Sequence, residues 1–456
     1  MTKRIYLISI KTLILLSPLP FGCVGRVWSP LFYLAVLFLS FLGLKLTGKE
    51  VIFLYEKKIR LCVYLIFGFI FFQFLPLPGF LLKLLSPGTL GIIDVLESPP
   101  PSFYSISVLP AETLGFALRF FVLVFFFYVL VKIELQKNEI FSLIHTMILS
   151  AVVQVIFGFL KFIQGNTLFY LFFYANRNPG AHLTGTIANP EHFSFYLEMI
   201  LPLAVAVLLA KSLFIGPHSS FREKLSSLLS EKKSVILYIP AVLLIATGII
   251  LTGSGAGISI SLLALFLMGS FTFYFSKFHH GRHMIRGVFT VIIIAIILWG
   301  VQQNLGTIMK PTNGNIDYSV CWSNSLELFS GFPLFGSGFG SFKYIYFLYD
   351  TGDSGWITHA HNDYLETFSD GGIIGGLLFL LLIGGILFSL FRMWLARRNP
   401  EVKAIGLGVL AAIFSAGFHS LFGFAMRIPA ISFLFVLILV SGLKMASYKS
   451  EFRDRI

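Results

Sequence analysis

Long apolar blocks separated by short polar segments constrain this chain more than any other feature of its sequence. Runs such as FALRFFVLVFFFYVLV and VFTVIIIAIILWGV approach the roughly 20 apolar residues that a helix needs to cross a bilayer. A transmembrane β-barrel would need shorter segments of alternating polarity instead. Only 12% of the residues are charged, whereas globular domains average about a quarter. We therefore predict an all-α polytopic membrane protein.

These blocks predict about twelve transmembrane helices. The predicted helices lie near residues 5–24, 28–46, 61–82, 113–132, 140–163, 193–214, 234–252, 256–276, 284–301, 372–391, 404–422 and 429–446. The first block resembles a signal peptide, but no Ala-x-Ala site follows it, so we interpret it as an uncleaved helix. We expect helices one to nine over 1–301, a large periplasmic loop domain over 302–371, and helices ten to twelve with a cytoplasmic tail over 372–456.

The positions of the basic residues predict the orientation of the chain in the membrane. If the N-terminus is cytoplasmic, 25 of the 34 lysines and arginines fall in cytoplasmic segments and 7 in outer segments. This asymmetry favours a bacterial inner-membrane protein with both termini in the cytoplasm. Because the net charge of +13 is spread over many short loops, we expect membrane lipids and no nucleic acid as partners. The three cysteines have no paired spacing and predict neither disulfides nor a zinc site.

The polar stretch THAHNDYLETFSDGGIIGG holds the most groups capable of chemistry. His359 and His361 precede a predicted short helix, which Asn362 or Asp363 would cap and Gly371–Gly372 would end. The positive end of a helix dipole disfavours imidazolium, so a histidine there remains available as a neutral base near pH 7. The alternative, favoured by spacing alone, is that both histidines only cap or pack in a polar loop.

A glycine-rich segment, GFPLFGSGFGSF, lies upstream of these histidines. Gly336, Gly338 and Gly340 form a GxGxG pattern, whose backbone N–H groups could cradle a phosphate. Because no nucleotide-type helix is expected after it, we favour a tight turn near the membrane surface.

Ionisable residues gather where the predicted helices meet the outer face. Ionisable residues within a membrane span are costly and are usually functional, although Arg119 could instead extend its side chain to the headgroups. The residues that gather at this face are Arg119, Arg177, His182, Glu191, His192, His361, His419 and Arg427. Cations and neutral bases that face lipid headgroups favour an anionic lipid substrate, such as a lipid-linked diphosphate bound by arginines. A histidine would then act as general base on a sugar hydroxyl, while Arg119, Arg177 and Arg427 stabilise the departing diphosphate.

Four segments in order, TGTIANPEHFSFYLEMILPLA, PLFGSGFGSF, AHNDYLETFSDGGIIGG and FHSLFGFAMRIPA, resemble the O-antigen ligase and polymerase superfamily over most of the chain. The third segment is the most specific. The resemblance implies a GT-C-like membrane fold and an inverting transfer of a glycan from undecaprenyl diphosphate, with neither cofactor nor metal. It implies that His361 is the base that activates the acceptor hydroxyl, with His359 as the second choice. Supporting roles are expected for Asn362, His182, His192, Glu191 and His419.

The chain departs from the family pattern at three places. Gly255 stands in TGSGAG where many members have an arginine. His182 and Thr184 occupy a region where many members carry another arginine, and Glu191 replaces a usual asparagine. These departures leave Arg177, Arg119 and Arg427 as the candidates for binding the diphosphate.

Several activities fit these observations. A ligase moves a finished glycan onto lipid A core, a polymerase joins repeat units, and a protein-glycosylating enzyme uses a serine or threonine acceptor; we prefer the ligase. A lipid or solute transporter would place its motifs at the bilayer midplane instead. A metal-dependent enzyme would use Asp363, Glu366 and Asp370, which are spaced about one helical turn apart.

Overall fold

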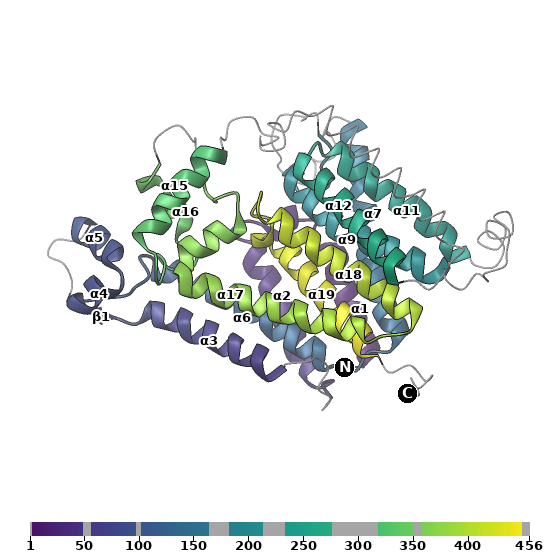
Figure 1. The fold of residues 1–456 in the computed structure, drawn as a ribbon, viewed down its shortest axis with the longest axis horizontal. Coiled ribbons are helices and arrows are strands. Elements are labelled where there is room, and N and C mark those ends of the chain that lie inside the picture. Colours follow the sequence, from purple (N-terminus) through teal and green to yellow (C-terminus); the bar gives the residue numbers. More distant parts are fainter. Residues whose placement is uncertain are drawn as a thin grey trace.

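The computed structural model describes residues 2–48, 56–96, 102–163, 182–212, 233–275, 318–350 and 357–448, which are mostly helical (Figure 1). Up to residue 212 the elements are α1 (Lys3–Leu16), η1 (Phe21–Cys23), α2 (Trp28–Leu44), α3 (Glu56–Phe74), β1 (Leu77–Pro78), α4 (Gly79–Leu85), α5 (Pro87–Leu96), β2 (Phe103–Tyr104), α6 (Pro110–Lys132), α7 (Lys137–Ile163) and α9 (Pro190–Ser212). Beyond it are α11 (Lys233–Leu251), α12 (Gly255–Phe275), α15 (Tyr318–Gly331), α16 (Phe342–Ile345), η2 (Tyr346–Leu348), α17 (Asp363–Leu395), α18 (Pro400–His419), η3 (Ala425–Arg427) and α19 (Pro429–Ser447).

Seven of the described helices are long and apolar enough to cross a membrane, namely α6, α7, α9, α12, α17, α18 and α19. Helix α2 and residues Tyr238–Leu251 of α11 are apolar but shorter. These helices confirm the predicted all-α polytopic membrane fold. The helix predicted near 284–301 lies outside the described residues, and the count of about twelve stays a prediction.

Proline shortens two of the predicted helices. The helix expected over 5–24 ends as α1 at the segment SPLP, after which the chain turns through η1. The helix expected over 61–82 begins earlier, as α3, and ends before the segment LPLP, which leads into β1 and α4. Proline lacks a backbone N–H and clashes with the preceding helical turn, so an apolar run can continue where the helix cannot.

Helices α9, α18 and α19 form the centre of the bundle. The spans of α9 and α19 are 83% and 89% buried, whereas those of α6 and α17 are only 28% and 33% buried. Small residues allow the central helices to approach closely: a Cβ added at Gly408 of α18 would collide with Ala206 of α9. Side chains at the ends of these central helices are therefore held in place by close helix packing.

The two ends of the bundle carry different polar groups. At one end, ion pairs join Lys3 to Glu139, Lys132 to Glu56, and Lys137 to Glu401. The opposite end, called here the histidine end, holds His192 in the first turn of α9, His361 just before α17, and His419 at the end of α18. These three lysines and three histidines thus lie at opposite ends of the bundle, and the compartment that each end faces stays a prediction.

Candidate active site

Local sequence explains how the chain enters the site. The Asn362 side chain accepts hydrogen bonds from the backbone N–H groups of Tyr364 and Leu365, at 3.1 and 3.0 Å, and so caps α17 as predicted. Gly372 breaks the helix with φ 63° and ψ −171°, after which the helix resumes and runs to Leu395. The expected short helix is therefore the first part of one long, interrupted membrane helix.

His361 has a strained backbone and a buried ring. Its φ is +50°, in the left-handed region that residues other than glycine rarely adopt. A backbone held in this region costs about 1–3 kcal/mol. Its Nδ1 is buried and has no hydrogen-bond partner among the described residues. Burial, helped by the charge of His359 and opposed by Glu366, lowers the pKa of His361 to about 4. The imidazole is therefore neutral near pH 7 and can accept a proton.

Three histidine rings surround the single aromatic ring of Phe424. The ring of His359 stacks on it at 4.1 Å between centroids, while His192 and His361 meet it nearly perpendicularly at 4.5 and 4.9 Å. Phe424 lies in the turn between α18 and η3, so it brings together residues from three separate regions of the chain. Its contacts fix the relative orientation of the three imidazoles.

A carboxylate orients the second candidate base. Nδ1 of His359 lies 3.0 Å from Oε1 of Glu366, and the backbone N–H of Ala360 donates to Oε2 of Glu366 at 3.0 Å. If Nδ1 carries the proton toward this carboxylate, Nε2 of His359 keeps a free lone pair. Because the His359 side chain is 26% exposed while Glu366 is only 2% exposed, the histidine is the accessible member of the pair.

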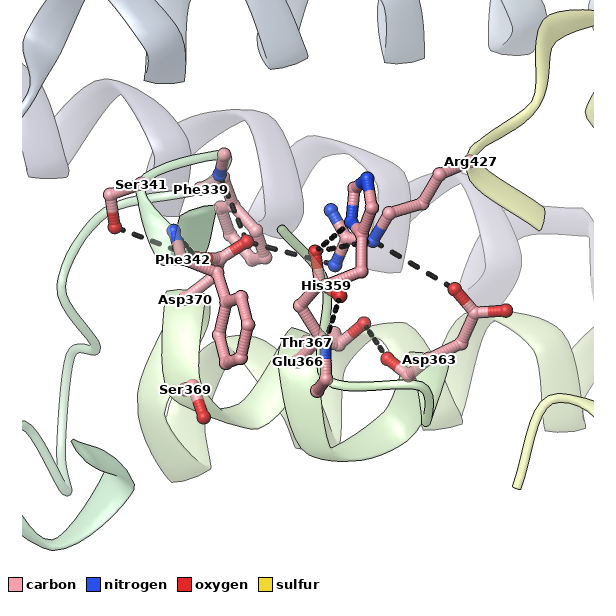
Figure 2. Close-up of polar contacts among 12 residues, drawn as sticks. Phe339, Ser341, Phe342, His359, Asp363, Glu366, Thr367, Ser369, Asp370 and Arg427 are labelled. Atoms are coloured by element: carbon pink, nitrogen blue, oxygen red, sulfur yellow. Dashed lines mark hydrogen bonds and ion pairs between the residues drawn. The ribbon is translucent and has the colours of Figure 1, made fainter. Parts of the chain in front are cut away.

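Arg427 lies among three carboxylates, as Figure 2 shows. Its Nε is 2.9 Å from Glu366 Oε1 and 3.8 Å from Asp363 Oδ1, and a terminal nitrogen is 3.7 Å from Asp370 Oδ2. Burial opposes the charge of Arg427, but the three carboxylates outweigh it and raise its pKa. The guanidinium thus occupies the space between the carboxylates that the sequence offered as metal ligands. These carboxylates compensate the charge of Arg427. This arrangement does not favour the predicted role of Arg427 in binding a diphosphate, which stays a prediction.

The glycine-rich segment wraps around Asp370 rather than enclosing an open cradle. The backbone N–H groups of Gly340 and Phe342 donate to the two carboxylate oxygens of Asp370 at 2.9 and 3.0 Å. Gly336, Gly338 and Gly340 all have positive φ, from 72° to 106°, so the segment needs glycine for its path. The segment forms the predicted tight turn, and its position near the membrane surface stays a prediction. The N–H groups at Gly340 and Phe342, which a phosphate would use, already bind a carboxylate.

Helix α9 contributes acidic groups from the other side of the site. The Tyr318 hydroxyl donates to Glu191, at 3.2 Å from each carboxylate oxygen, and the Tyr318 ring lies 5.2 Å from the ring of His361. Deeper in the bundle, Nδ1 of His419 lies 3.0 Å from Oε1 of Glu198, and both side chains are almost fully buried. This buried pair joins α9 to the last residue of α18, five residues before Phe424.

The structure gathers most of the predicted site residues, but not all of them. The cluster contains His359, His361, Asn362, Glu191, His192, His419 and Arg427. The Arg119 side chain is exposed on α6, beside Gly115, and Arg177 lies outside the described residues. His182 packs against Gly253, in the turn between α11 and α12.

Sequence reasoning missed three contributors to this cluster. The sequence predicts Glu366 only as a metal ligand. Its position, one turn into the helix that follows the histidines, is the signal that could indicate a partner for His359. Tyr318 and Phe424 reach the histidines through long-range contacts, which the local pattern does not reveal.

The fold and the site define a class: a multi-pass membrane protein with a buried histidine–carboxylate cluster at one end of its helices. A family model described as O-Antigen ligase matches residues 240–380, a range that includes the glycine-rich segment, both histidines and the start of α17. This match confirms the resemblance to the O-antigen ligase superfamily. It supports a ligase- or polymerase-type glycosyltransferase function with a lipid-linked glycan as substrate. A search of curated proteins gave no match.

Proposed function

We propose that this protein transfers a glycan from undecaprenyl diphosphate to an acceptor hydroxyl, at the periplasmic face of a bacterial inner membrane, with inversion at the anomeric carbon. The observation that carries the proposal is the state of His361. Its backbone is strained and its buried Nδ1 has no hydrogen-bond partner among the described residues, within the stretch that matches the family, and burial lowers its pKa to about 4. Strain of this kind persists where the surrounding structure maintains it, and it is concentrated at functional sites.

The proposed reaction needs one proton acceptor. The acceptor hydroxyl gives its proton to a nitrogen of His361 as its oxygen bonds to the anomeric carbon. The bond from that carbon to the diphosphate oxygen breaks, and the diphosphate leaves with the electron pair. Because attack and departure occur on opposite faces, the anomeric configuration inverts.

Neighbouring groups support this step without taking part in bond exchange. Glu366 orients His359, the alternative base, while Arg427 compensates Glu366 and holds the turn that carries Phe424. Arg119 and Arg177 remain the proposed cations for the departing diphosphate. His182, His192, Glu191, His419 and Asn362 shape the site around them.

We expect lipid A core as the acceptor and therefore ligase activity, with polymerase or protein-glycosylating activity as the alternatives. A strain that lacks the protein tests this choice through its surface glycans. Accumulation of free lipid A core indicates a ligase, whereas core carrying single repeats indicates a polymerase. Unchanged surface glycans together with loss of glycosylated proteins would contradict both.

The low pKa of His361 predicts an unusual pH dependence of transfer. Neutral His361 accepts the proton and imidazolium does not, so activity is present above the pKa and lost below it. From about pH 8 to about pH 5 the initial rate should change little, and it should fall as the pH approaches about 4. Initial rates measured across this range in detergent would check this. A midpoint near the ordinary histidine pKa of about 6.5 would show that His361 is not the titrating base.

A further inference from the structure

The described residues 77–96 and 102–104, between α3 and α6, form a small folded arm. Strand β1 pairs with β2, with Leu77 opposite Tyr104, and the pair closes the loop that contains α4 and α5. Inside this loop Leu82 and Tyr104 are buried and pack with Ile106. In Figure 1 the arm lies beyond one end of α3. The arm is thus a folded element whose buried residues also pack against Phe72 of α3 and Phe335 of the glycine-rich segment.

The outer surface of the arm is strongly apolar. Phe80, Leu84 and Val95 are 74%, 75% and 84% exposed, the three largest values for large hydrophobic side chains among the described residues. Phe80 and Leu84 are one helical turn apart and share one face of α4. Exposed Lys83 lies next to them in the sequence. An outer face of this composition is typical of an element that contacts a membrane or a partner.

The neighbours of the arm favour a membrane as its partner. Helix α6 follows β2 after five residues, and its apolar span is only 28% buried within the protein. Gly88 of α5 packs against the backbone of Gly331, at the end of α15, which places the arm at the histidine end. The arm therefore lies beside the first residues of a helix that is long and apolar enough to cross a membrane. A basic residue beside an apolar face matches the headgroup region of a leaflet.

We propose that the arm lies in the headgroup region of the leaflet at the histidine end, with Phe80 and Leu84 inserted among the acyl chains. The residues that follow the arm connect it to the candidate active site. The backbone N–H of Val108 donates to the carbonyl of Ser337 at 2.9 Å, within the glycine-rich segment that binds Asp370. Lipid contact at the arm would thereby anchor that segment relative to the membrane surface.

A nitroxide label at Leu84→Cys tests this placement. The three native cysteines are first replaced by alanine, and Asp94→Cys, which changes an exposed polar residue of α5, serves as the matched control. In phospholipid vesicles, collisions with oxygen report lipid contact, and collisions with a water-soluble nickel complex report exposure to water. Because Leu84 is 75% exposed, its replacement should leave the fold unchanged, which thermal unfolding would verify.

We expect the Leu84 label to collide several-fold more often with oxygen than with nickel, and the Asp94 label to show the reverse. A Leu84 label that collides mainly with nickel would place the arm in water and overturn the proposal. Protection of the Leu84 label from both reagents would also overturn it, because a protein surface would then cover the arm. Neither outcome depends on glycan transfer, so the proposed function is tested separately.

Discussion

Replacing His361 with asparagine should lower the rate of glycan transfer by about a hundred- to ten-thousand-fold, the usual contribution of a general base. Asparagine removes the basic nitrogen but tolerates the left-handed backbone found at this position, so the loop should keep its path. The measurement is the initial rate of release of undecaprenyl diphosphate from a lipid-linked donor. An unchanged thermal unfolding midpoint would show that the loss is chemical rather than structural.

Two further variants make this prediction specific. Thr358→Asn alters an exposed residue of the same loop and should leave the rate within about twofold of the native protein. His359→Ala removes the alternative base that Glu366 orients. If His359→Ala lost transfer while His361→Asn retained the native rate, the base would be His359, and our assignment would be wrong.

Replacing Arg427 with methionine should destabilise the protein by about 3–5 kcal/mol, because it removes the cation from a buried cluster of three carboxylates. Glu366 and Asp370 are 2% and 0% exposed, so water cannot compensate their charges. The expected result is a large drop in the thermal unfolding midpoint of the purified protein in detergent.

Lys343→Met supplies the matched control for Arg427. Lys343 also pairs with a carboxylate, that of Glu112, but the two side chains are 39% and 30% exposed. Ion pairs at this exposure contribute about 0–1 kcal/mol, so this variant should unfold close to the native midpoint. Equal, small losses in both variants would mean that the charge of Arg427 is not needed by the cluster. That result would return Arg427 to the list of candidate diphosphate ligands.

Most of the fold follows from the sequence because membrane helices depend on a local property. An apolar run of sufficient length specifies a helix in lipid, since every backbone polar group must be satisfied within its own segment. The predictions differ from the structure where proline interrupts such a run, at SPLP after α1 and LPLP after α3. Hydropathy alone does not predict where proline ends the helix.

The site could be predicted only in its local parts. The cap at Asn362 or Asp363 and the break at Gly371–Gly372 depend on residues within one or two turns, so the sequence predicts both, and the structure has Asn362 as the cap. By contrast, Phe424 reaches His361 across 63 residues, and Arg427 reaches Glu366 across 61. A single sequence shows that Arg427 is an ionisable residue at a membrane boundary. Three-dimensional contacts are needed to show that carboxylates of the protein already compensate its charge.

The most direct test of the central claim is a transfer assay with the purified protein in vesicles, a defined undecaprenyl diphosphate-linked glycan and lipid A core. The account predicts one undecaprenyl diphosphate released for each glycan attached to the acceptor, with the anomeric configuration inverted when followed by nuclear magnetic resonance. An intact donor that crosses the vesicle membrane without bond cleavage would identify a transporter instead and would contradict the account.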